Sequence, residues 1–225
     1  MIKTVFLDVD NTLMDFSECA RLAMIKGFAE AGLSYSEEMF PVFTTINNGL
    51  WEDIEKGKLT RDELHEIRWV RIFNALGIST DGKAFEKCFL NHLCEAPGLM
   101  PGALRLLEYL APRYTLCLAS NASQAQQMKR LAHSGILPFV QEVFLSESLG
   151  VPKPEKEFFD ICFSRLPGAV PEESIIIGDS LTADMKAGIT CGIKTCWFNP
   201  DMLPAPAEYK IDYVVHSLLE IKQIL

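Results

Sequence analysis

Two acidic residues stand two positions apart at the end of the first apolar run of this 225-residue chain. The run from Thr4 to Val9 predicts a β-strand, and Asp8 and Asp10 lie at its end, close to Thr12. A carboxylate placed in line with a phosphorus atom can attack it and form an aspartyl-phosphate. A second carboxylate on the same side of an extended chain can protonate the leaving oxygen and later deprotonate a water molecule. The pair therefore predicts a nucleophile and an acid/base, although an Asp-x-Asp after a strand is also a common turn or helix cap.

Further polar groups stand at or near the ends of later apolar runs, in separate loops. They are Ser120-Asn121 after the second predicted strand, Gly178-Asp179 after the run of three isoleucines, and Lys153 in the loop that opens the following helix. In open parallel sheets, ligands bind beyond the carboxyl ends of the strands. We therefore expect these groups, together with Asp184, to share one rim of the sheet with Asp8.

Several carboxylates on one rim cannot all be ionised unless a cation lies between them. The acidic residues concerned are Asp8, Asp10, Asp179 and Asp184. They are hard oxygen ligands with no histidine or cysteine among them, so we expect Mg²⁺ rather than zinc. A phosphate group bound there would find its other oxygens close to Lys153, to Ser120 and to the backbone N–H of Asn121.

Each of these groups also has a simpler explanation when it is taken alone. Lys153 can be a solvated surface lysine, and Ser120-Asn121 can be the N-cap of the following helix. Asp184, inside a predicted helix, can be a surface charge. Their joint placement at several predicted strand ends favours one shared site.

Strands and helices alternate from residue 97 onward. We predict strands at residues 114–119, 143–145, 174–177, 194–198 and, at an edge, 213–215, with helices at 102–110, 123–133, 155–165, 182–187 and the C-terminus. This alternation is typical of a parallel sheet covered by helices on both faces. We expect an α/β fold, with a Rossmann-like, doubly wound parallel sheet that includes the first strand.

The segment that follows the first strand has a helical pattern instead. Residues 17–32 predict a helix that ends at Gly32, and capping-box patterns at Ser34-x-x-Glu37 and Thr60-x-x-Glu63 predict further helix starts. We expect four or five helices here and find no alternating strand pattern. The predicted organisation is an α/β core domain at residues 1–15 and 94–225, with an all-helical cap domain inserted at residues 16–93.

Composition limits the partners and the environment. The chain has 21 Lys and Arg against 30 Asp and Glu, and its formal charge of −9 argues against nucleic acid or an anionic membrane as a partner. Its seven cysteines form no C-x-x-C pair, so we expect neither a disulfide framework nor a zinc site. We see no signal-peptide pattern and no apolar run near the roughly 20 residues of a membrane span. We expect a cytoplasmic monomer or homodimer that acts on a small molecule.

The ordered set of polar groups resembles the four motifs of the haloacid dehalogenase superfamily. The matching segments are Asp8–Leu13, Ser120-Asn121, Lys153-Pro154 and Gly178–Asp184, and the one departure is Asn11, where many members have glycine. The resemblance implies that Asp8 is the nucleophile and Asp10 the general acid/base. It also implies that Mg²⁺ is bound by Asp8, the Asp10 carbonyl and Asp179, with support from Asp184. Thr12 would position the first loop. The phosphate group would be held by Ser120, Asn121 and Lys153.

The helical segment and the extension of the first motif are similar to the pyrimidine 5′-nucleotidase branch, which implies a nucleoside monophosphate as substrate. A nucleotidase needs a flat apolar contact for the base, and Phe16, Phe43 and Trp51 are candidates unless they belong to the core. Asn47 and Asn48 can read a pyrimidine edge or simply turn the chain. The alternatives are a phosphatase for sugar phosphates or phosphoglycolate, a phosphomutase, and a metal-independent dehalogenase, which would need neither Asp10 nor Asp179.

Overall fold

The computed structural model describes residues 1–96 and 98–225, and these form two compact units. The core unit comprises Met1–Asp15 and Gly98–Leu225, and the helical unit comprises Phe16–Pro97. The boundary that we predicted after residue 93 falls inside helix α4 (Gly82–Glu95), because the buried Leu93 and Ala96 still pack in the core of the helical unit. Pro97, where we expected the change of pattern, lies outside the described residues.

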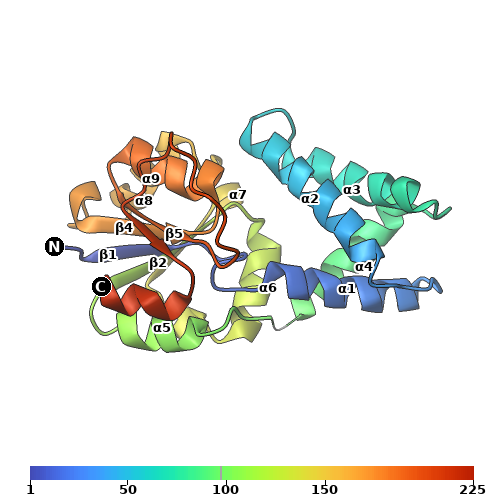
Figure 1. Ribbon diagram of the computed structural model, residues 1–225, viewed down its shortest axis with the longest axis horizontal. Helices are drawn as coiled ribbons and strands as arrows, with labels where there is room; N and C mark the ends of the chain where they lie inside the picture. The colour runs from blue at the N-terminus through green and yellow to red at the C-terminus, as the bar shows by residue number, and fades with distance from the viewer. Residues whose placement is uncertain (97) are drawn as a thin grey trace. The chain divides into compact units, whose positions relative to one another are not determined.

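A parallel sheet of six strands organises the core unit, in the order β3-β2-β1-β4-β5-β6 (Figure 1). The strands are β1 (Thr4–Leu7), β2 (Thr115–Ser120), β3 (Glu142–Leu145), β4 (Ser174–Gly178), β5 (Lys194–Phe198) and β6 (Tyr213–Val215). Each neighbouring pair is parallel, including the edge pair of β5 and β6. The predicted doubly wound fold is confirmed, together with its edge strand.

Alternate residues of the central strands enter two separate hydrophobic clusters, because successive side chains of a strand point to opposite faces. Val5 and Leu7 of β1 belong to one cluster, whereas Phe6 belongs to the other. Such strands read as continuous apolar runs in the sequence, since both faces of a parallel sheet are buried. This pattern made the strands predictable.

Helices cover both faces of the sheet (Figure 1). One cluster includes residues of α5 (Ala103–Leu110), α6 (Gln124–Ser134) and the 3₁₀ segment η4 (Leu218–Gln223), and the other includes residues of α8 (Lys156–Ser164) and α9 (Lys186–Cys191). The shorter elements are η1 (Leu137–Phe139), α7 (Ser146–Leu149), η2 (Pro171–Glu173) and the π-helical turn η3 (Leu181–Met185). Over the described residues, no helix combines the length and the apolar character that crossing a membrane requires.

The described part of the helical unit consists of α1 (Phe16–Glu30), α2 (Met39–Glu55), α3 (Arg61–Leu76) and α4. Its core is a cluster of aromatic rings around Trp69, which packs edge-on against Phe85 with ring centroids 4.4 Å apart. Each large aromatic side chain can bury about 150–250 Å² of surface. The helical unit therefore has its own hydrophobic core.

One of the two predicted capping boxes forms. The Thr60 hydroxyl accepts a hydrogen bond from the Glu63 N–H, and the Glu63 carboxylate accepts one from the Thr60 N–H. The prediction at Ser34 was wrong, because α2 begins only at Met39 and Glu37 instead contacts Arg21. The capping-box pattern alone does not determine whether a helix begins at its first residue.

This difference gives a matched pair of variants. Thr60→Ala removes a helix cap and should lower the free energy of unfolding by about 1 kcal/mol, whereas Ser34→Ala, outside any helix, should leave it unchanged. Urea unfolding followed by circular dichroism measures both. Equal effects of the two substitutions would contradict the assignment of the cap.

Candidate active site

The site lies at the carboxyl ends of the central strands of the core unit. Strand β1 stands between β2 and β4, so the chain winds outward in both directions from it. The loops that follow β1, β2 and β4 therefore open next to one another, at the kind of switch point where doubly wound sheets bind ligands. Asp8, Ser120 and Asp179 come into one place in this way.

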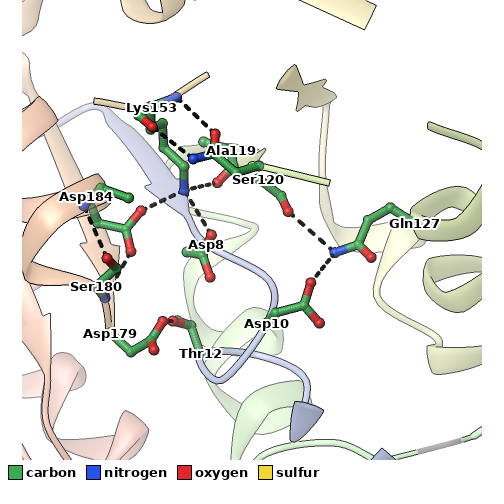
Figure 2. A network of polar contacts seen from close by, with 12 residues as sticks. Asp8, Asp10, Thr12, Ala119, Ser120, Gln127, Lys153, Asp179, Ser180 and Asp184 are labelled. Atoms are coloured by element: carbon green, nitrogen blue, oxygen red, sulfur yellow. Dashed lines mark hydrogen bonds and ion pairs between the residues drawn. The ribbon is translucent and has the colours of Figure 1, made fainter. Parts of the chain in front are cut away.

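Lys153 is the centre of the contacts, as Figure 2 shows. Its ammonium group donates to Asp8 Oδ1 at 2.8 Å, to Asp184 Oδ1 at 2.5 Å and to the Ala119 carbonyl at 2.5 Å. The lysine is 1% exposed and Asp184 is 1% exposed. Burial alone would lower the pKa of Lys153, but Asp184 and Asp8 raise it above its ordinary value and keep the group charged. The interpretations of these two residues as surface charges are thus excluded.

The carboxylates of Asp8, Asp179 and Asp184 form a group whose oxygens lie within 4.8 Å of one another. Burial raises the pKa of Asp8 to about 7, with Lys153 opposing this shift and Asp184 adding to it. Burial and the charges of Asp8 and Asp184 also raise the pKa of Asp179 well above its ordinary value. One lysine faces three carboxylates, and this excess of negative charge together with an all-oxygen ligand set suits a Mg²⁺ ion.

Two local features bring Asp184 and Asp179 into position. The π-helical turn η3 begins after Ser180, whose hydroxyl accepts from the Ala183 N–H, while the Asp184 carboxylate accepts from the Ser180 N–H. Thr12 donates from its hydroxyl to Asp179 Oδ1 at 3.2 Å. Thr12 therefore links the loop after β1 to the loop after β4, in agreement with a positioning role.

Asn11 occupies the left-handed region of backbone conformation, with φ of 59°. Glycine is favoured in that region, and asparagine is among the residues that tolerate it best. Asparagine at position 11 is thus compatible with the backbone conformation between Asp10 and Thr12.

The predicted phosphate-binding pair does not cap a helix. Ser123 is the N-cap of α6, because its hydroxyl accepts from the Gln126 N–H. The Asn121 side chain instead exchanges hydrogen bonds with the backbone of Lys153, donating to its carbonyl and accepting from its N–H, each at 2.8 Å. Asn121 therefore ties the loop that carries Lys153 to the end of β2.

The Asp10 carboxylate does not join the other carboxylates, and two residues that the sequence analysis did not single out contact it. Gln127 donates to its Oδ2 at 2.9 Å, and Arg130 donates to its Oδ1 at 2.5 Å. Both are buried, on the face of α6 that also carries Leu131. Their helical spacing with this core leucine is the signal from which their burial could have been inferred.

The candidates for contact with a base belong to the helical unit. Phe43 and Asn47 are buried there: Phe43 packs on Trp69, and the Asn47 side chain accepts a hydrogen bond from Arg68. Phe16 and Trp51 are half-buried. Phe43 and Asn47 therefore serve the core of the helical unit, while Phe16 and Trp51 stay predictions.

Comparison with known proteins assigns this sheet and its loops to a family of hydrolases. Residues 2–192 match the family of haloacid dehalogenase-like hydrolases. The chain belongs to this family.

The relatives extend over almost the whole chain. HAD-hydrolase YfnB of Bacillus subtilis is 38% identical over 223 residues, 99% of this chain and 95% of YfnB. Pyrimidine 5′-nucleotidase PynA of Streptococcus pneumoniae is 33% identical over 99% of this chain and 94% of PynA, and pyrimidine 5′-nucleotidase YjjG of Escherichia coli is 28% identical over 98% and 96%. A crystal structure of YfnB bound to magnesium matches with a TM-score of 0.94, covering 100% of this chain and 98% of that one.

The backbone of β4 passes very close to Asp184. A Cβ atom at Gly178 would lie 2.2 Å from Asp184 Oδ2 and 2.4 Å from its Cγ, so only glycine fits without a shift of that side chain. Gly178→Ala should lower the free energy of unfolding by about 1–3 kcal/mol, as overpacking does. Thermal unfolding measures the change.

Gly49→Ala is the matched control. Gly49 lies in α2, and a Cβ atom added there would meet no atom within 4 Å, so alanine should be neutral or stabilising by up to about 1 kcal/mol. An unchanged unfolding transition in Gly178→Ala would contradict the close approach.

Proposed function

We propose that this protein is a Mg²⁺-dependent phosphatase of small phosphate monoesters, acting most readily on pyrimidine nucleoside 5′-monophosphates. The observation that carries the proposal is the contact of the buried Lys153 ammonium with both Asp8 and Asp184, beside Asp179. The proposal assigns the nucleophile to Asp8, the fixed positive charge to Lys153 and the magnesium ligands to the carboxylates around that lysine, and the contacts between these groups support it. Electrostatic stabilisation of this kind usually contributes more to catalysis than any other single effect.

The residues divide the reaction into two steps. In the first, an Asp8 oxygen forms a bond to phosphorus as the bond to the leaving oxygen breaks, and Asp10 gives that oxygen a proton. In the second, Asp10 takes a proton from water as the water oxygen bonds to phosphorus, and the Asp8–phosphorus bond breaks. Inorganic phosphate leaves, and both carboxylates return to their first state.

The charges of the site hold the phosphoryl group during both steps. Lys153 neutralises one oxygen, and Ser120 with the Asn121 N–H receives another. Asp8, the Asp10 carbonyl and Asp179 would hold Mg²⁺, with Asp184 in support, and the bound ion supplies positive charge to the transferring group. Support for a nucleotide as substrate comes from the similarity to PynA and YjjG.

Phosphate release from a panel of monoesters tests the proposal. The panel holds UMP, dUMP, dTMP, AMP, GMP, phosphoglycolate, glucose 6-phosphate and p-nitrophenyl phosphate, each with Mg²⁺ and with EDTA. We expect turnover only with Mg²⁺ and fastest with the pyrimidine nucleotides. A preference for sugar phosphates or phosphoglycolate would contradict the nucleotide as substrate, but it would agree with the proposed phosphatase reaction.

Asp8→Asn provides the chemical control. Its amide oxygen can still accept the hydrogen bond from Lys153, so the fold should survive, but the amide is not a usable nucleophile. Turnover should fall below detection, while thermal unfolding shows that the variant is folded. Turnover at the wild-type rate would contradict the role of Asp8 as the nucleophile.

Trp51→Ala tests the predicted contact with the base. Stacking on an aromatic ring is worth roughly 1–3 kcal/mol per base, so KM for UMP should rise about 5- to 160-fold. The KM for acetyl phosphate, which has no ring, should not change. Thr45→Ala, an exposed change in the same helix, is the control. An equal rise in KM for both substrates would indicate that Trp51 has a purely structural role.

A further inference from the structure

Two donors from one helix hold the two oxygens of Asp10. Gln127 Nε2 lies 2.9 Å from Oδ2 and Arg130 Nη1 lies 2.5 Å from Oδ1. The same Arg130 nitrogen donates to Gln127 Oε1 at 3.0 Å, so the two side chains also brace each other. Figure 2 shows the Gln127 amide directed at the Asp10 carboxylate from α6.

The two donor side chains are buried. Gln127 is 1% exposed and Arg130 is 4% exposed, whereas the Asp10 side chain is 29% exposed. A buried guanidinium is costly to desolvate, and replacing buried ion pairs by apolar residues is often neutral or stabilising. A gain in stability is therefore a weak explanation for the buried ion pair of Arg130 and Asp10. A role in the reaction explains it better, because Asp10 is a proposed residue of the active site.

The Gln127 amide also reaches the phosphate-binding side of the site. Its Nε2 donates to Ser120 Oγ at 3.4 Å as well as to Asp10. One side chain thus fixes the distance between the acid/base and a residue that we place against the phosphate. In the proposed reaction, the ester oxygen that must receive the proton is bonded to the phosphorus atom of the phosphate group that Ser120 would contact.

We propose that Gln127 and Arg130 are positioning residues, which hold the Asp10 carboxylate at the place from which it exchanges a proton with the leaving oxygen and with water. This rests on the proposed phosphatase function. Each carboxylate oxygen keeps a second lone pair, so the contacts from α6 leave Asp10 able to carry and transfer a proton. Proton transfer requires approach to hydrogen-bond distance, and a displacement of about 1 Å can lower a rate roughly 100-fold.

The test compares esters that differ in their need for a proton. Release of p-nitrophenol needs little help because its anion is stable, whereas release of the alcohol from UMP needs protonation. Single-turnover experiments with excess enzyme isolate this first step. In Arg130→Met and Gln127→Leu, we expect uridine release to slow about 10- to 100-fold and p-nitrophenol release to change less than about 3-fold.

A double-mutant cycle separates positioning from a general loss of structure. In an Asp10→Asn background, Arg130→Met should cause no further loss with UMP, because the group that it positions is already absent. Lys129→Met, an exposed change on the same helix, should behave as the wild type, and Arg130→Lys should recover part of the rate with UMP. Gln127→Leu keeps the Asp10–Arg130 ion pair and supplies an independent result if Arg130→Met does not fold.

Failure of the inference and failure of the proposed function look different. Equal losses with both esters, or additive losses in the cycle, would overturn the positioning role in an active phosphatase. Absence of phosphate release from every ester by the wild-type protein with Mg²⁺ would overturn the function itself, and the inference with it.

Discussion

The whole site depends on a lysine ammonium buried among oxygens. Lys153 contacts Asp8, Asp184 and the Ala119 carbonyl, so it joins the loop after β1, the end of β2 and the π-helical turn after β4. Such a charge is tolerable in the interior only when its partners satisfy it. Its three oxygen partners do so, but the surrounding carboxylates outnumber it. The Mg²⁺ ion of the proposed function would offset this excess of negative charge.

The backbone near this lysine also depends on particular residue types. Gly178 lets Asp184 approach the end of β4, and Asn11 accepts the left-handed conformation that the turn after Asp10 requires. The Asn121 side chain fixes the loop of Lys153 through its backbone. At Gly178 a larger side chain would displace Asp184, and at position 11 the turn requires a residue that tolerates a positive φ.

Asp8 and Asp10 are neighbours in sequence with different surroundings. Asp8 lies against the lysine among other carboxylates, whereas Asp10 is held from α6 by an amide and a guanidinium. Two carboxyl groups in different environments can take different chemical roles. The two separate sets of contacts are consistent with the proposed division between nucleophile and acid/base.

The sequence alone determined the parallel sheet and the residues of its loops, because buried strands read as apolar runs and polar residues stand at their ends. It also predicted that Asp8, Asp10, Lys153 and Asp179 share one rim of the sheet, since the carboxyl ends of parallel strands meet at one edge. Only the tertiary structure decided how these groups are paired. It separated Asp10 from the other carboxylates, buried Phe43 and Asn47, and brought Gln127 and Arg130 from a helix more than a hundred residues away in sequence. Helical spacing can indicate that these two side chains face the core, but it does not show which residue of another loop they contact, because that depends on how the helix packs on the sheet.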